Sequence, residues 1–188
     1  MRQSSLRPNQ EKFIKEMATF LKENPTAVLT VTPMQYVEKE KEHILLFEAK
    51  KKFFLQSHQL KSMTEKDSIL IDKMSVKDSF FMRYLQQKMS NKDVFTLQEK
   101  CDILIGKDLV ANRFRQLMQN RATEFKSYFG DLVSRIHFKT EQNTIPFNGF
   151  SYYKIQYEGQ IPESLLEAYQ ELQDLNEEAP RGKYKDKR

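Results

Sequence analysis

Apolar residues recur every three or four positions in three stretches of the chain, and this spacing predicts three amphipathic helices. They span residues 9–24, 108–130 and 162–176. Asn9 and Asp108 are of the residue types that cap helix N-termini, so we expect the first two helices to begin there. The apolar face of the second helix is formed by Val110, Phe114, Leu117, Met118, Ala122, Phe125 and Phe129.

Three short stretches have the pattern of β-strands. Residues 27–31 are almost entirely apolar and lie between Pro25 and Pro33, which is typical of a central strand. Residues 135–140 and 152–157 alternate apolar and polar side chains and predict two further strands, which could pair with each other or flank the first. Together these elements predict an α/β fold of the α+β type, a two-layer sandwich with a small mixed sheet covered by helices on one face.

The region between the first strand and the second amphipathic helix has a different composition. It is polar, contains several methionines and shows helical spacing at residues 43–60, 69–74 and 80–89. Its low strand propensity argues against a contribution to the sheet. We therefore predict a helical insertion over about residues 43–95 within a single domain of residues 1–176.

Positive charge is concentrated at the C-terminus. The chain has a formal net charge of +5, and residues 180–188 hold five basic residues and one acidic residue. The remaining body is nearly neutral and lacks the clustered charge that a nucleic-acid surface needs, so we expect no nucleic-acid partner. We predict that residues 177–188 form a disordered basic tail, with nucleic-acid binding through this tail as a weaker alternative.

The overall composition favours a globular protein. A chain of 188 residues with 12% aromatic residues can bury a core without disulfides, and its one cysteine, Cys101, cannot form an internal disulfide. No run of 18 apolar residues and no apolar leader occurs in the sequence. We therefore expect a cytoplasmic protein if Met1 is the native start, or else a piece of a longer protein.

Recognisable catalytic and metal-binding motifs are missing from the sequence. His43, His58 and His137 have no metal-ligand spacing, so we expect surface histidines, no metal site and no cofactor. Cys101 precedes an apolar stretch, which favours a neutral, buried thiol over a nucleophile. With five glycines, the chain has no phosphate-binding loop and no nucleophile elbow. We expect a non-catalytic protein, and an enzyme of unknown type is the alternative.

Aromatic residues cluster at residues 147–153, where a turn leads into the last predicted strand. Such a turn can present a stacking surface to a sugar or a base, and Asn148 and Tyr152 are then candidate ligand contacts. The alternative is that these aromatic side chains pack against the sheet and that Asn148 and Gly149 simply form the turn.

The order of the elements and several local strings resemble a known family. Residues 20–25 read FLKENP before the apolar strand, a long charged helical segment follows, and Arg121-Ala122 lies on the helix before the next strand. Residues 99–128, followed by RIHF, are similar to the C-terminal domain of AsmA-like envelope proteins, an uncharacterised family, in its Bacteroidetes type. The resemblance extends over nearly the whole chain and implies an OmpA-like fold.

This resemblance also implies a function and a location. The chain would be the periplasmic C-terminal domain of a long, membrane-anchored protein of the cell envelope. It would be a non-catalytic binding module for an envelope protein or for peptidoglycan. In OmpA-like domains that bind peptidoglycan, a strand ending in Thr-Asp and a helix bearing Arg-Ala hold the diaminopimelate end of the stem peptide. Arg121 matches the second motif, whereas Thr32 is followed by Pro33 and the acidic partner is missing.

The position of Arg121 on its helix adds a geometric expectation. It lies four residues after Leu117 and four before Phe125, so its stem should lie on the apolar face while its guanidinium reaches out. From there the guanidinium could present a planar pair of donors to a carboxylate ligand. A structural salt bridge with Glu99 or Glu124 is the alternative.

Overall fold

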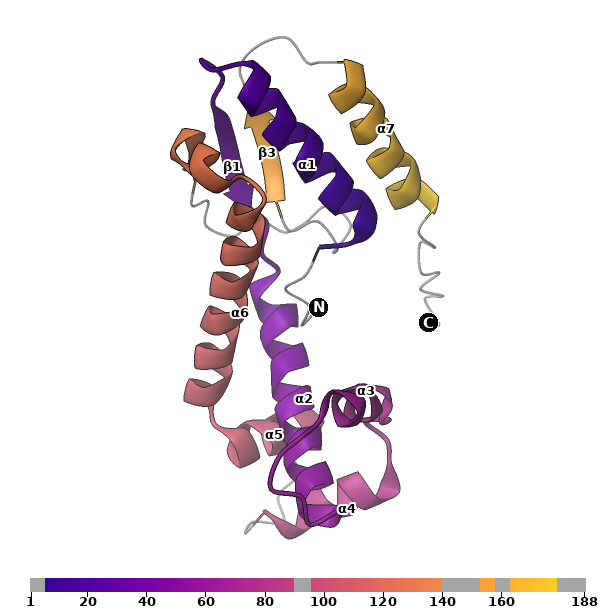
Figure 1. Ribbon diagram of the computed structural model, residues 1–188. Helices are drawn as coiled ribbons and strands as arrows, with labels where there is room; N and C mark the ends of the chain where they lie inside the picture. The colour runs from indigo at the N-terminus through magenta and orange to yellow at the C-terminus, as the bar shows by residue number, and fades with distance from the viewer. Residues whose placement is uncertain (1–5, 90–95, 140–152, 158–162, 179–188) are drawn as a thin grey trace, which may run out of the picture. The chain divides into compact units, whose positions relative to one another are not determined.

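Figure 1 shows the computed structural model of the chain, which divides into two compact units. We call residues 37–119 the helical unit, and residues 6–36 together with the described residues from 120 onward the sheet unit. The structure describes residues 6–89, 96–139, 153–157 and 163–178.

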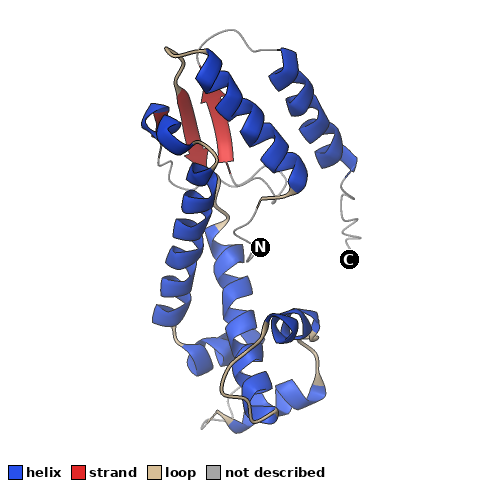
Figure 2. Cartoon of the chain, in the orientation of Figure 1, coloured by secondary structure: helices blue, strands red, loops and turns tan. Residues whose placement is uncertain are grey.

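The sheet unit contains a three-stranded mixed sheet. Its strands are β1 (Leu29–Pro33), β2 (Ile136–Phe138) and β3 (Tyr153–Tyr157), in the order β2-β1-β3. β1 is parallel to β2 and antiparallel to β3, and Figure 2 draws the strands in red. The predicted α+β class and the central position of the first strand are confirmed, and the two later strands flank the first instead of pairing with each other.

The core of the sheet unit lies where β1 meets α1 (Pro8–Glu23) and the C-terminal part of α6 (Lys107–Ser127). Leu29 and Val31 point from β1 to the same face, because side chains two residues apart on a strand share a face, and both are fully buried. This burial explains why positions 29 and 31 are apolar. The other buried members of the cluster are Ile14, Met17, Ala18, Phe20, Leu21, Ala27, Phe125, Phe129 and Ile136.

The last helix, α7 (Glu163–Glu178), packs against α1. Lys12 Nζ lies 2.8 Å from Glu171 Oε2, and the rings of Phe13 and Tyr169 are 6.1 Å apart. The predicted helix is confirmed and continues two residues beyond its predicted end. Most of the predicted basic tail, residues 179–188, lies outside the described residues.

The first helix begins earlier than Asn9, so the prediction that Asn9 caps it is wrong. Arg7 is the N-cap and Pro8 is the first helical residue. Proline suits this position because its φ is already helical and its missing N–H would have no partner there. The backbone N–H of Arg7 donates to Gln10 Oε1 at 3.0 Å, which supplies the capping contact.

The long helix α6 also begins before its predicted cap. It starts at Lys107, which places Asp108 in the first turn, where its negative charge still favours the helix dipole. The helix begins this early because Gly106 ends the preceding helix with φ +84° and ψ 141°. This conformation lets one helix follow another directly, without a loop that needs a separate N-cap.

The helical unit contains α2 (Val37–Ser57), α3 (Glu65–Lys73), α4 (Ser79–Gln87), α5 (Leu97–Ile105) and the first part of α6. The three helices predicted in the middle region are confirmed as α2, α3 and α4. α2 begins six residues before its predicted start. The core of the unit consists of Ile44, Leu45, Ala49, Phe81, Tyr84, Leu85, Cys101, Val110 and Leu117.

Helix α5 was not predicted, although its N-terminus carries a capping box. Thr96 Oγ1 accepts a hydrogen bond from the backbone N–H of Glu99 at 3.2 Å, and Glu99 Oε2 accepts one from the backbone N–H of Thr96 at 2.7 Å. The hydrogen bonds from the backbone and side chain of Thr96 lower the pKa of the Glu99 carboxyl. Most of its apolar residues, Cys101 and Ile103–Ile105, are crowded into its C-terminal half, so they do not recur at regular helical spacing.

The predicted insertion at residues 43–95 falls inside the helical unit, which extends further in both directions, to residues 37–119. A single domain over residues 1–176 stays a prediction. Among the helices of the described ranges, none combines the length and the apolar composition needed to cross a bilayer.

Arg135 holds the C-terminal end of α1. Its Nη1 donates to the carbonyl oxygen of Asn24 at 2.8 Å and to that of Ala27 at 3.4 Å, and its Nη2 donates to the carbonyl oxygen of Leu21. Carbonyls at a helix end have no partner within the helix, and a positive charge there also favours the dipole. Arg135 therefore ties the residue before β2 to the turn between α1 and β1.

We expect Arg135→Met to lower the free energy of unfolding by about 1.5–3 kcal/mol, because it removes charged hydrogen bonds to several carbonyls. The matched control is Arg115→Met, since Arg115 is exposed and its guanidinium bonds only the Asn112 side chain among the described residues. Urea unfolding followed by circular dichroism measures both variants. Equal loss of stability in the two would contradict the capping role of Arg135.

Two tyrosines differ in whether their hydroxyls have partners. Tyr84 Oη is buried and forms no hydrogen bond within the described part of the chain, whereas Tyr128 Oη donates to Glu11 Oε1 at 3.0 Å. A buried hydroxyl without a partner costs about 1–3 kcal/mol. We expect Tyr84→Phe to raise the unfolding free energy by about 1 kcal/mol and Tyr128→Phe to lower it by a similar amount. Shifts of the same sign in the same urea assay would contradict this assignment.

Candidate functional site

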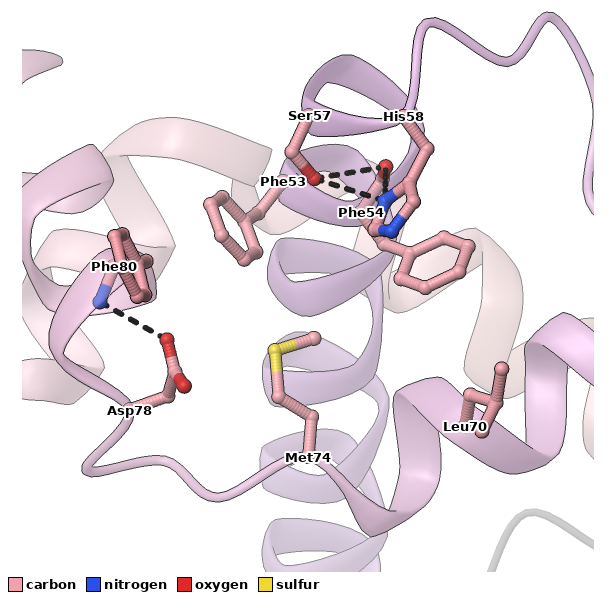
Figure 3. A pocket seen from close by; sticks show the side chains of 8 residues that line it. All are labelled: Phe53, Phe54, Ser57, His58, Leu70, Met74, Asp78 and Phe80. Atoms are coloured by element: carbon pink, nitrogen blue, oxygen red, sulfur yellow. Dashed lines mark hydrogen bonds between the residues drawn. The ribbon is translucent and has the colours of Figure 1, made fainter.

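An open groove of about 460 Å³ lies on the helical unit (Figure 3). The last turns of α2, the middle of α3 and the start of α4 form it. Phe80 and Leu70 stand at its edge and are 68% and 56% exposed, unusually high for large apolar side chains. Its lining residues are Phe53, Phe54, Ser57, His58, Leu70, Met74, Asp78 and Phe80.

The connection after α3 is fixed to α2 by a buried lysine. Lys50 Nζ donates to the carbonyl oxygen of Met74 at 2.5 Å. The hydrogen bond satisfies both a charged group and a carbonyl inside the unit. It holds Met74 in the groove, where Figure 3 shows its side chain projecting between Leu70 and Phe80.

Serine, histidine and aspartate all line this groove, but they do not form a catalytic triad. His58 Nδ1 lies 2.9 Å from the carbonyl oxygen of Phe54, and a carbonyl only accepts, so Nδ1 carries the proton. Ser57 Oγ donates to that same carbonyl oxygen at 3.1 Å and also lies 3.1 Å from His58 Nδ1, from which it can only accept while Nδ1 is protonated. A triad needs the serine proton to pass to an unprotonated imidazole nitrogen. Nδ1 of His58 therefore cannot act as the base for Ser57.

Asp78 has a structural task at the start of α4. Its Oδ1 accepts hydrogen bonds from the backbone N–H groups of Phe80 and Phe81 at 3.0 and 2.9 Å. Figure 3 shows the carboxylate directed at Phe80, across the groove from His58. The polar groups of the groove are therefore satisfied by nearby backbone, and apolar side chains form the surface that a ligand would meet.

Arg121, the candidate ligand contact, is only 4% exposed. It lies between Leu117 and Phe125 on the apolar face of α6, as the spacing predicted. The expectation that its guanidinium reaches solvent is wrong, because the whole side chain is buried. A buried guanidinium needs hydrogen-bond partners to offset its lost hydration. Arg121 therefore belongs to the interior of the sheet unit.

The surroundings of Arg121 place it near the end of β1. Tyr153 is the register partner of Pro33, the last residue of β1, and its ring lies 4.5 Å from that of Phe125. Burial raises the pKa of the Tyr153 hydroxyl to about 12, and the charge of Arg121 opposes this rise. The positive charge of Arg121 therefore acts on a residue beside the end of β1. The resemblance predicts an acidic residue at this strand end, where the chain has Pro33.

The other candidates from the sequence have different outcomes. Asn148 and Tyr152 lie outside the described residues. Glu99, a suggested partner of Arg121, belongs to the helical unit and accepts hydrogen bonds from Thr96. Pairing of Arg121 with Glu124 stays a prediction.

The histidines lie on the surface, as predicted: His43, His58 and His137 are all exposed. Among the described residues no three metal-ligating side chains come together. Leu70 and Phe80 were not singled out from the sequence, whereas Tyr153 was part of the aromatic cluster at residues 147–153. The adjacent phenylalanines at 80 and 81 were the available signal, because neighbouring residues on a helix do not face the same way. In the structure Phe80 is exposed and Phe81 is buried.

No family model, curated protein or solved structure matches the chain. The resemblance to AsmA-like and OmpA-like proteins therefore stays a prediction.

Cys101 is buried in the core of the helical unit, which confirms the expected neutral thiol. Burial raises its pKa to about 11, the nearby Asp102 adds to the rise, and Lys50 opposes it. We expect Ellman's reagent at pH 8 to label the folded protein at least about 100-fold more slowly than the urea-unfolded chain, because both access and thiolate are lacking. Labelling at the unfolded rate would contradict the buried position.

The raised pKa of the Cys101 thiol predicts that the stability of the fold depends on pH. The unfolded thiol ionises near its ordinary pKa of 9.0, whereas the folded thiol ionises at about 11. Between these values the unfolded state binds fewer protons, so the stability contributed by this group falls as pH rises. The decline should be smaller in Cys101→Ala than in the wild type in urea titrations across that range, because only the contributions of other groups, such as the Tyr153 hydroxyl, remain.

Proposed function

We propose that this chain is a non-catalytic binding module of the cell envelope. It would be the periplasmic C-terminal domain of an AsmA-like protein with an OmpA-like fold, and it would bind a partner protein or the cell wall. Its parent chain would be anchored in a membrane. The order of helix, central strand, helical segment, helix and flanking strands agrees with the pattern on which the resemblance depends.

The observation that carries the binding role is the chemistry of the groove. Its serine, histidine and aspartate are engaged by backbone groups within a few residues, while Leu70 and Phe80 are exposed. A catalytic site needs titratable groups that converge on one point, and a binding surface needs accessible apolar area. The groove therefore favours binding over catalysis.

Two features favour a protein partner over the cell wall. Pro33 occupies the position of the acidic residue in the Thr-Asp motif, and Arg121 is buried. A wall peptide would have to displace the residues around Arg121 to reach its guanidinium. We therefore place the protein partner first and peptidoglycan second.

The experiment is a calorimetric titration of a diaminopimelate-containing muropeptide into the wild type, Arg121→Lys and the exposed control Arg115→Lys. Arg121→Lys keeps the charge and removes the planar pair of donors. We expect no saturable binding by any of the three proteins, which excludes the wall and leaves a protein partner.

Two other outcomes decide the alternatives. Binding by the wild type and by Arg115→Lys that is lost in a folded Arg121→Lys would instead assign the wall peptide as ligand. Cleavage of the muropeptide during the titration would contradict a non-catalytic module. Fractionation of the native host tests the location, and recovery of the parent protein only from the cytoplasm would contradict an envelope role.

A further inference from the structure

The edge of the groove combines exposed apolar side chains from two helices. Phe80 projects from the first turn of α4 and Leu70 from the middle of α3, and Ile69 beside it is 52% exposed. Isolated exposed apolar residues are common on proteins, but a cluster around a concavity is typical of an interaction site. Met74 lies within this cluster and is unbranched, so it can adapt its shape to a bound side chain.

Basic side chains accompany these apolar ones. Lys66, Leu70 and Lys73 are spaced by four and three residues, so they share one face of α3. Lys77 lies in the short connection to α4, next to the lining residue Asp78. All three lysines are exposed. Their side-chain ammonium groups form no ion pair with another described residue, and Lys77 donates only its backbone N–H, to Ser75 Oγ at 3.1 Å.

The acidic residues nearby offset only part of this charge. Residues 50–83, which contain the whole groove, hold eight Lys and Arg residues against four Asp and Glu residues. Two of the four cap helices: Asp67 accepts hydrogen bonds from Thr64, and Asp78 accepts them from the start of α4. The groove is therefore an apolar concavity with a positively charged edge.

We propose that the groove binds an acidic amphipathic helix of a partner protein. Apolar side chains at successive turns of such a helix would contact Phe54, Leu70 and Phe80, and carboxylates beside them would face Lys66 and Lys73. A helix in a groove buries its apolar face without exposing unsatisfied backbone. Complementary charge adds specificity and speeds association. This inference deepens the proposed function, because it names the chemistry of the protein partner.

The probe is a fluorescein-labelled 18-residue peptide with leucines on one helical face and glutamates on the other. A scrambled peptide of the same composition and a peptide with lysine for glutamate are its controls. Fluorescence anisotropy against the full chain should give a dissociation constant on the order of 10–100 μM at low salt, as expected for a small interface. Raising the salt concentration from about 50 to 300 mM should weaken binding several-fold, since exposed charges are screened.

Two double variants test the two parts of the groove. Leu70→Ser with Phe80→Ser removes exposed apolar groups, and Lys66→Glu with Lys73→Glu reverses the charge. Each should weaken binding at least tenfold. Because all four side chains are exposed, the variants should fold, which circular dichroism and thermal unfolding verify.

Matched control variants lie elsewhere on the helical unit. Ile103 and Leu109 are 58% and 40% exposed and do not line the groove, so Ile103→Ser with Leu109→Ser controls for lost apolar surface. Lys107→Glu with Arg115→Glu controls for the charge change, since both residues are exposed on α6. Both control proteins should bind the peptide like the wild type.

Several outcomes would overturn the inference. They are the absence of saturable peptide binding, equal binding of the scrambled or basic peptide, and binding that the groove variants leave unchanged. Sedimentation with phosphatidylglycerol vesicles that depends on Leu70 and Phe80, without peptide binding, would assign the groove to a lipid surface instead. A negative peptide result leaves the muropeptide titration informative, so failure of this inference and failure of the proposed function can be told apart.

Discussion

Burial of the central strand is the constraint on which the sheet unit depends. β1 has five residues and its neighbours have three and five, so the sheet is too small to be stable without helices against it. Leu29 and Val31 are covered by apolar side chains from α1 and from the end of α6. Arg135 then ties the end of α1 to the start of β2. Residues more than 100 positions apart are thereby held in one core.

Desolvation shapes the chemistry of both units in the same way. The hydroxyl of Tyr153 and the thiol of Cys101 both have raised pKa values because burial disfavours their charged forms. The pKa of the Tyr128 hydroxyl is also raised to about 12, first by desolvation and then by its hydrogen bond to Glu11. None of these groups ionises near neutral pH. Cys101 therefore adds no charge to the helical unit near neutral pH.

The sequence predicted the parts of the fold that follow a strong local pattern. The apolar run at 27–31 indicated a central strand, and the periodicity of α1 and α6 indicated their buried faces. It did not predict α5, whose apolar residues are crowded into its C-terminal half, or the start of α6 at Lys107, which depends on the conformation of Gly106. Strand order was left open because pairing between distant segments leaves no local signal.

Less of the candidate site could be predicted. The spacing placed Arg121 on an apolar face, but only the packing around Tyr153 and Phe125 shows that its guanidinium is buried. The groove depends on three helices that are separate in sequence, so no local motif marks it. Ser57 and His58 are residue types that occur in catalytic triads. Only their hydrogen bonds to the carbonyl oxygen of Phe54 show that they do not form a nucleophile and base pair.

The two described glycines with positive φ set different limits on how this sequence can diverge. Gly130 has φ +52°, in the left-handed helical region that asparagine and aspartate also adopt. Gly106 combines φ +84° with ψ 141°, a region that residues with a β-carbon essentially avoid. A β-carbon at Gly106 would meet no atom within 4 Å, so backbone torsion, and not space, excludes other residues there. Over evolution Gly130 should drift to asparagine in some descendants, whereas the junction between α5 and α6 should keep its glycine even where the surrounding surface has changed completely.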